Sequence, residues 1–174
     1  RFNVILDELP DEWNGYRISS GFRIGIQITQ LLENENYSMT ERLAHATEML
    51  FDDMPDTMEE CIQGIRWFLS GWNYDRKGKE RQDDIIVMDY DVDQWRIHAA
   101  FIRQYHIDLS CAQMHFWEFM GLLASLEECR FTRVMDIRTM KIDTKMSAKE
   151  KESIRKAQEI YRITGELPEE ERIS

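Results

Sequence analysis

Apolar side chains recur at spacings of three and four residues along most of the chain, which is the periodicity of amphipathic helices. Polar or charged runs separate the periodic segments. The pattern predicts a mainly α fold, a compact helical domain of about six to seven helices. The expected helices lie over residues 22–35, 38–51, 56–72, 91–107, 111–125, 130–140 and 147–163.

Residue pairs of the capping-box type mark most of the expected helix starts. The pairs are Ser38 with Glu41, Asp56 with Glu59, Asp91 with Gln94, Ser110 with Gln113, and Ser147 with Glu150. Ser19 or Ser20 is expected to cap the first helix. A cap at Ser110 would make Ile107, Asp108 and Leu109 a tight turn between two helices. In the helix before that turn, Val92, Trp95, Ala99 and Ile102 share one apolar side.

A short N-terminal hairpin is the one expected sheet. Asn14 and Gly15 stand between Trp13 and Tyr16, and Asn-Gly suits a type I′ turn because both positions need positive φ. We therefore expect a hairpin over residues 3–18. Length predicts a single domain over residues 1–163, with an exposed charged loop at 73–90 and a disordered acidic tail at 164–174.

Composition narrows the classes of partner. The 174 residues carry a net charge of −11, which disfavours broad affinity for nucleic acid or an anionic membrane. Residues 1–72 hold thirteen acids and five bases, whereas residues 94–146 hold six acids and seven bases, so a local basic surface stays open. No stretch of 18 apolar residues and no signal-peptide pattern is present, and Cys61, Cys111 and Cys129 do not suggest a disulfide framework. These features indicate a soluble cytoplasmic protein with reduced thiols, buried as structural cysteines.

The most suggestive chemistry lies in the stretch "HIDLSCAQMHFWEFMGLLASL". On a helix, Cys111, His115 and Glu118 would share one polar strip among large apolar residues. Three such residues on one helix, without a second ligand pair, are weak evidence for zinc, and a Cys111 nucleophile with His106 or His115 as its base has no further support. We expect this strip to be the outer face of a packed helix.

Other candidates have plain structural interpretations. His98 is expected to be a hydrogen-bonded histidine at the edge of the core and not a ligand, and His45 to have an equally plain structural role. The adjacent pairs Asp52–Asp53 and Asp83–Asp84 suggest solvated loops and not a facing acid/base pair. A basic group comprises Arg130, Arg133, Arg138 and Lys141. It could contact phosphate, but it is expected to pair with the acidic first half of the chain or with an acidic partner. The sequence thus assigns no catalytic, cofactor-binding or metal-binding residue, and leaves the partner-binding residues unknown.

One stretch of the chain is distinctive as a whole. Residues 89–140 contain a "DYD" opener, "AAFIRQYHIDL", "MHFWEFMGLLASL" and a Phe-x-x-Val-Met-x-Ile-Arg run at 131–138. Upstream, Leu9–Pro10, Phe22–Arg23 and "IRWFLSG" add to it. In order and spacing these motifs resemble the bacteriophage gene-product-fifteen family, over most of residues 4–163. Two departures stand out: Phe116–Trp117 where the family often has paired tryptophans, and His106 where it often has Gly before the Ile-Asp-Leu turn.

The resemblance implies a helical phage or prophage protein encoded among the tail genes, and no catalytic group. It implies a tail-assembly chaperone in the bacterial host cytoplasm, which would shield the long helical tape-measure protein and help to recruit tail-tube subunits. A minor virion component, such as a tail-completion protein, is the alternative, and a metal- or thiol-dependent enzyme is a third. Neither a nucleic acid nor a membrane is an expected partner, and self-association is left open.

Overall fold

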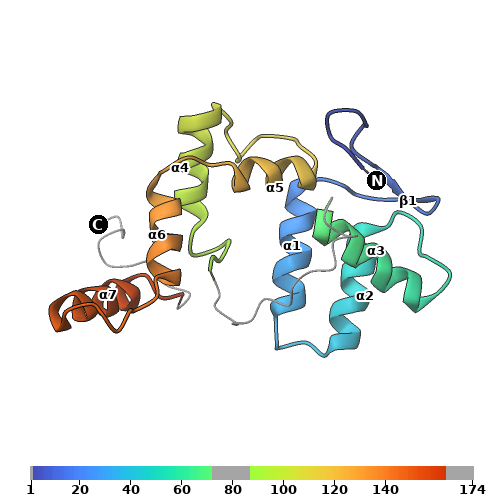
Figure 1. The fold of residues 1–174 in the computed structure, drawn as a ribbon. Helices are drawn as coiled ribbons and strands as arrows, with labels where there is room; N and C mark the ends of the chain where they lie inside the picture. Colours follow the sequence, from blue (N-terminus) through green and yellow to red (C-terminus); the bar gives the residue numbers. More distant parts are fainter. Residues whose placement is uncertain (1, 72–86, 164–174) are drawn as a thin grey trace. The chain divides into compact units, whose positions relative to one another are not determined.

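The computed structural model describes residues 2–71 and 87–163, and seven helices and one hairpin lie within these ranges (Figure 1). The mainly α class and the short N-terminal hairpin are confirmed. The helices are α1 (Phe22–Glu33), α2 (Met39–Leu50), α3 (Met58–Ser70), α4 (Gln94–Tyr105), α5 (Phe116–Ala124), α6 (Arg130–Thr139) and α7 (Ala148–Ile160). The expected tail at 164–174 and most of the expected loop at 73–90 lie outside the described residues.

The chain is organised as two compact units. Unit 1 comprises residues 1–80 and 113–124, and unit 2 comprises residues 81–112 and 125–174. Unit 1 therefore holds the hairpin with α1, α2, α3 and α5, while unit 2 holds α4, α6 and α7. That residues 1–163 form a single domain stays a prediction.

The hairpin pairs β1 (Glu12–Trp13) with β2 (Tyr16–Arg17) in antiparallel register, Trp13 opposite Tyr16. Asn14 and Gly15 have φ of 49° and 86°, as a type I′ turn requires. The expected extent of 3–18 is wrong, because the strands are short. Residues 3–7 form a separate hydrogen-bonded turn, in which the Asn3 carbonyl accepts from the amides of Leu6 and Asp7.

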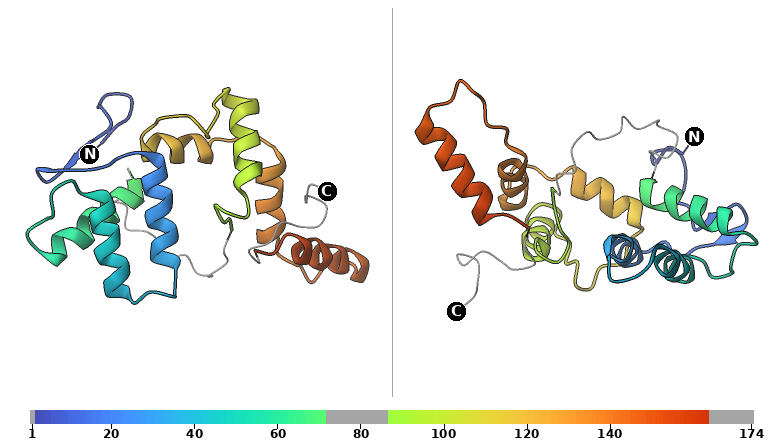
Figure 2. Two further views of the ribbon diagram at one scale, coloured as in Figure 1. Left: turned by 180° about the vertical axis from the view of Figure 1, so that it is seen from behind. Right: turned by 90° about the horizontal axis from the view of Figure 1, so that it is seen from below.

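In unit 1, α1 and α2 lie side by side and α3 and α5 cross them on one side (Figure 2). Fully buried Ile28, Leu50, Phe68 and Phe119 form its core. Helices α1 and α5 approach closely because Gly25 has no side chain: a Cβ there would overlap the Phe116 ring. The Trp117 indole N–H donates to the Phe68 carbonyl at 2.8 Å and ties α5 to α3.

Two capping boxes lie where the sequence places them. Ser38 and Glu41 cap α2, and Ser147 and Glu150 cap α7. At α3 the predicted Asp56–Glu59 pair is off by one residue: Thr57 and Glu60 form the box, while the Asp56 amide donates to the Tyr16 hydroxyl. The α1 cap is Gly21 and not Ser19 or Ser20.

Helix α5 begins five residues later than its predicted start at 111, and the Ser110 cap does not form. The Ser110 amide and hydroxyl instead donate to the Asp108 carboxylate. Residues 114–116 pair with 20–22: the Phe22 amide donates to the Met114 carbonyl at 3.0 Å, and the Phe116 amide to the Ser20 carbonyl at 2.8 Å. This long-range pairing overrides the local preference for helix and also satisfies the first amide of α1.

In unit 2, α4 and α6 pack side by side and α7 meets α6 at a steep angle (Figures 1 and 2). Phe101, Phe131 and Val134 form its core. The predicted Asp91–Gln94 cap is wrong, because α4 follows Asp93, whose carboxylate pairs with arginines. The apolar side predicted for this helix is buried only in part: Val92, just before α4, is buried, whereas Trp95, Ala99 and Ile102 are exposed. The buried residues of α4 itself are Arg96, Ile97, Ala100 and Phe101.

Candidate interaction surface

The polar strip predicted from Cys111, His115 and Glu118 does not form. Cys111 is exposed in a turn that precedes α5, His115 is half-buried at the start of the helix, and Glu118 is exposed on it. The three therefore do not share a helix face. No group of three or more His, Cys, Asp or Glu side chains among residues 2–71 and 87–163 has a metal-binding arrangement.

His115 has a structural role that the sequence did not reveal. Its Nδ1 accepts from the Trp117 amide at 2.9 Å, so the imidazole caps α5 as a Ser or Asn side chain caps other helices. Its Nε2 lies 2.8 Å from the Pro10 carbonyl, which fixes the neutral tautomer with the proton on Nε2. Burial lowers the pKa of His115, against the opposing effects of the Pro10 carbonyl, Glu118 and Asp11.

The other single candidates are structural or exposed. His45 is exposed beside Glu48. His98 is half-buried, as a core-edge histidine should be, and its Nε2 lies 4.0 Å from the Asp108 carboxylate, which is too far for a hydrogen bond. Asp52 accepts from the Ser19 hydroxyl at 3.4 Å. Asp53 is exposed, whereas Asp83 and Asp84 lie outside the described residues. Of the thiols, Cys61 is buried as predicted, but Cys129 is half-buried and Cys111 exposed, so the expectation of three buried cysteines is wrong.

The basic group around α6 does not act as a unit. The Arg138 guanidinium is buried and donates two hydrogen bonds to Asp93, at 2.7 and 3.1 Å. It also donates to the carbonyls of Tyr161 and Val87, while Arg96 binds the same carboxylate. Arg138 thus joins α4, α6 and the end of α7.

The remaining basic residues stay near the surface. The exposed side chain of Arg133 pairs with Glu128, and Arg130 and Lys141 are exposed. The acidic partners of Arg133 and Arg138, which are Glu128 and Asp93, lie outside residues 1–72, so the expected pairing with the acidic first half is not seen for these two arginines. Because Arg138 is enclosed, the group offers no shared phosphate site.

Helix α4 presents an apolar face to solvent. Trp95 and Ile102 are 60% and 44% exposed, and the exposed Ala99 lies between them on the same side of the helix. The His98 ring meets the Trp95 indole edge-to-face, with centroids 5.7 Å apart, and holds it. An ordered exposed Trp is unusual in a chain that can bury its aromatic residues, and Trp is among the residue types that dominate protein interfaces.

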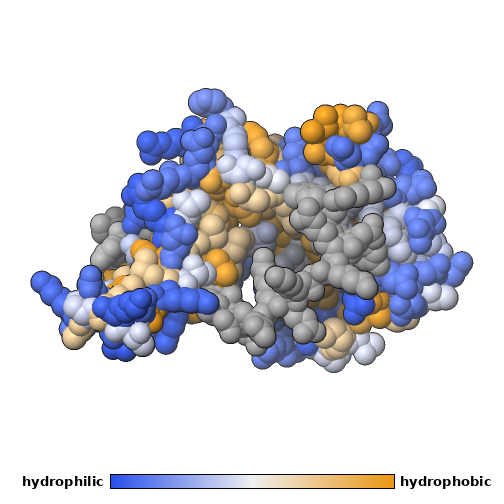
Figure 3. All heavy atoms as spheres, in the orientation of Figure 1, coloured by the Kyte–Doolittle hydropathy of each residue, from blue (hydrophilic) through white to orange (hydrophobic). Residues whose placement is uncertain are grey.

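A second exposed apolar feature is the N-terminal turn, residues 3–7. Val4, Ile5 and Leu6 are 65%, 87% and 79% exposed. Figure 3 shows a hydrophobic patch over this turn, at the upper right. The sequence placed these residues in a strand, although Asn3 and Asp7, which favour turns, flank the three aliphatic residues.

A comparison with protein families decides what kind of protein carries these surfaces. The model of a family described as "Bacteriophage Gp15 protein" matches residues 5–163. The chain belongs to this family. No curated protein and no solved structure matches it.

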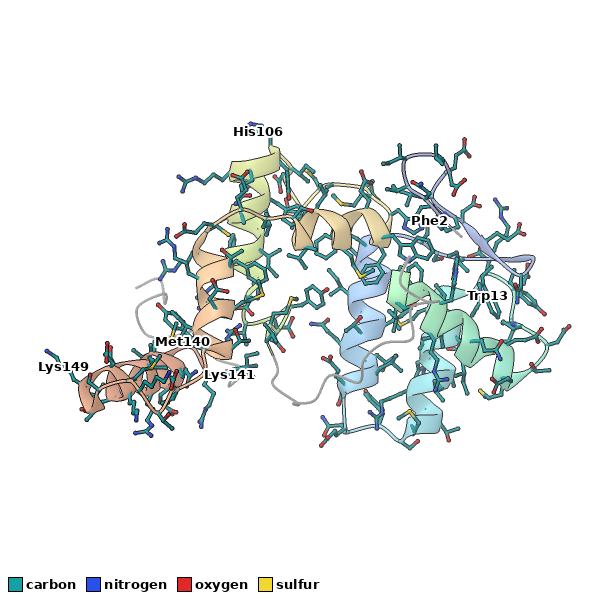
Figure 4. The ribbon with its side chains drawn as sticks, in the orientation of Figure 1. Phe2, Trp13, His106, Met140, Lys141 and Lys149 are labelled. Carbon is teal, nitrogen blue, oxygen red and sulfur yellow. The ribbon has the colours of Figure 1, made fainter. Side chains whose placement is uncertain are left out.

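In this Gp15 protein, helix α4 ends in a backbone conformation that favours glycine. His106 is the C-cap of α4 and has φ 57° and ψ 30°, a left-handed conformation that Gly adopts without strain. Figure 4 shows it at the C-terminal end of α4.

Among the described residues, no helix is both long and apolar enough to cross a membrane.

Proposed function

We propose that this Gp15 protein is a non-enzymatic assembly protein of a long-tailed phage or prophage. In this proposal it acts as a tail-assembly chaperone that binds the tape-measure protein in the host cytoplasm and helps to recruit tail-tube subunits. The family match supports a phage protein, and the exposed apolar face of α4 supports a role in binding. The exposed Trp95 is the single observation on which the proposed binding function depends.

The α4 face suits an amphipathic helix as its ligand. Trp95, Ala99 and Ile102 repeat the spacing of three and four residues by which helices pack on each other. The small Ala99 between two large side chains leaves room for a side chain of the partner helix, and the indole adds a large apolar area at little cost in side-chain entropy. A long helical protein with apolar stripes would offer many equivalent segments to this face.

Coexpression of the full chain with its neighbouring tape-measure protein tests this proposal. We expect a larger soluble fraction of the tape-measure protein and a complex that copurifies. In the Trp95→Lys variant the complex should weaken at least about 30-fold, since truncating an interface Trp typically costs 2 kcal/mol or more.

Met54→Lys is the matched control, because Met54 is 58% exposed in the connection between α2 and α3. It should bind as the unaltered chain does. Both variants should keep the unaltered unfolding temperature, because both side chains are exposed. An insoluble tape-measure protein, or equal binding by both variants, would rule out the proposed α4 contact.

A further inference from the structure

The N-terminal turn holds its aliphatic side chains outward by a set of internal hydrogen bonds. The Asn3 amide donates to the Asp7 carboxylate at 2.7 Å, and the Ile5 amide donates to the Asn3 side chain at 2.9 Å. The Asn3 carbonyl closes the turn by accepting from Leu6 and Asp7. Next to the turn, the Phe2 ring packs edge-to-face on Trp117 of α5, with centroids 5.1 Å apart. The aliphatic tip is thus presented from a fixed base.

Acidic residues follow this tip closely in the chain. Residues 3–12 contain Asp7, Glu8, Asp11 and Glu12, all exposed, and no basic residue. A surface that receives the turn must therefore combine exposed apolar side chains with positive charge. An anionic membrane would take the aliphatic tip but repel the acidic residues that follow it.

The connection between α6 and α7 has the complementary character. In residues 140–145, Met140 and Ile142 are exposed apolar residues that alternate with the exposed Lys141, and Lys145 follows them. Figure 4 labels Met140 and Lys141 in this connection. We call this segment the apolar–basic strip. Its one acid, Asp143, has its carboxylate occupied by the Lys145 amide and the Thr144 hydroxyl.

Two contacts fix the strip against α7. The Gln158 side chain donates to the Met140 carbonyl at 2.8 Å, and Lys151 donates to the Thr144 carbonyl at 3.1 Å. The first contact also brings Met140 close to the end of α7, where Ile160 is exposed. Residues 141–156 hold six basic and three acidic side chains, so the neighbourhood of the strip is positive in an otherwise acidic chain.

We infer that the N-terminal turn of one copy of this protein docks on the apolar–basic strip of a second copy. Three aliphatic side chains on an acidic base would meet exposed Met and Ile side chains between lysines, so both charge and apolar character match. The contact is heterologous, because two different surfaces meet. Repeated from copy to copy, such a contact closes into a ring or grows as a filament. The inference does not rest on the proposed binding of a tape-measure protein.

Sedimentation of the full chain over a range of concentrations provides the first test. We expect assemblies larger than a dimer that dissociate on dilution. Ile5→Asp should raise the dissociation constant at least tenfold by placing a charge in the apolar contact. Met39→Asp is the matched control, since Met39 is 57% exposed at the start of α2, where an acidic residue is tolerated. A chain that is monomeric at every concentration, or equal loss in both variants, would overturn the inference.

Exchange of charges tests the direction of the contact. Glu8→Lys with Asp11→Lys and Glu12→Lys leaves Asp7 as the one acid against three lysines and makes residues 3–12 basic, and Lys141→Glu with Lys145→Glu makes the strip acidic. Each multiple variant alone should fail to assemble, because like charges then meet. A mixture of the two should assemble again, since each turn then meets a strip of opposite charge. Failure of the mixture, with both variants folded by circular dichroism, would disprove head-to-tail contact.

Discussion

His106 shows how one side chain can fit a backbone conformation less well than glycine would. Its backbone is left-handed at the end of α4, with φ 57°. A side chain with a Cβ is strained in this region, and Gly is not. The local geometry is thus that of a glycine C-cap, with a histidine in its place.

The change His106→Gly should therefore stabilise the protein. We expect the free energy of unfolding to rise by about 0.5–1 kcal/mol. This is the backbone strain that glycine relieves, minus the cost of the greater conformational entropy that glycine gives the unfolded chain. Urea denaturation followed by circular dichroism measures the difference. Arg103→Gly, in the last turn of the same helix, should lower the free energy by about 1 kcal/mol. A loss of stability in both variants would contradict the backbone argument.

His115 makes stability depend on pH. Burial lowers its pKa in the folded chain, so the unfolded chain takes up the proton at a higher pH. The stabilisation is complete above the ordinary histidine pKa near 6.5 and is lost as the pH falls toward the lower pKa of the folded state. Protonation would also remove the Nδ1 acceptor for the Trp117 amide.

We accordingly expect the free energy of unfolding to fall between pH 7 and pH 5, which denaturation at a series of pH values would measure. His115→Asn keeps a helix-capping acceptor but does not titrate, so its curve should be flatter over this interval. The exposed His45→Asn is the control and should follow the unaltered chain. Parallel curves for His115→Asn and the unaltered chain would exclude His115 as the titrating group.

At the scale of elements, the sequence predicted helix positions better than helix ends and faces. The box of Ser38 with Glu41 was predictable because it involves neighbours only. The start of α5 was not, because it depends on backbone pairing with Ser20 and Phe22, more than 90 residues away in the chain. The buried face of α4 was missed because it contains a charged residue, Arg96. Its guanidinium is buried in an ion pair with Asp93, which also pairs with Arg138, and hydrophobic periodicity does not reveal such a pairing.

The candidate site was less predictable than the fold. Spacing alone placed Cys111 and Glu118 on one helix face, but the late start of α5 separates them. The exposure of Trp95 was not predictable, because an apolar residue at helical spacing has the same pattern whether it faces a core or a partner. The exposure of a side chain depends on how the whole chain folds, so the local sequence pattern does not reveal it.

The buried contact of Asp93 with Arg138 joins α4 to α6 and lends itself to a test. Arg138→Ala would leave Asp93 buried beside Arg96 alone, and should lower the free energy of unfolding by about 3–5 kcal/mol. Arg133→Ala removes an exposed pair with Glu128 and should cost no more than about 1 kcal/mol. Thermal and urea denaturation measure both changes. Similar losses in the two variants would mean that the buried pair is not a major support of unit 2.

At the scale of the whole molecule, the proposed chaperone and a structural tail protein differ in their fate. A chaperone acts during assembly and leaves, whereas a tail-completion protein stays. Mass spectrometry of purified phage particles should therefore find the tape-measure protein without this Gp15 protein. Its presence at a fixed ratio to other tail proteins would instead favour the virion component.

The division of the chain into units has a consequence for synthesis on the ribosome. Helix α5 supplies Phe116, Trp117 and Phe119 to unit 1, yet it follows α4 of unit 2 in the chain. The first 80 residues emerge without these aromatic side chains, and 44 more must be translated before α5 is complete. At about 5–20 residues per second, the core of unit 1 stays open for roughly 2–9 s on each nascent chain. The N-terminal half of the protein therefore completes its core only after α5 has been synthesised.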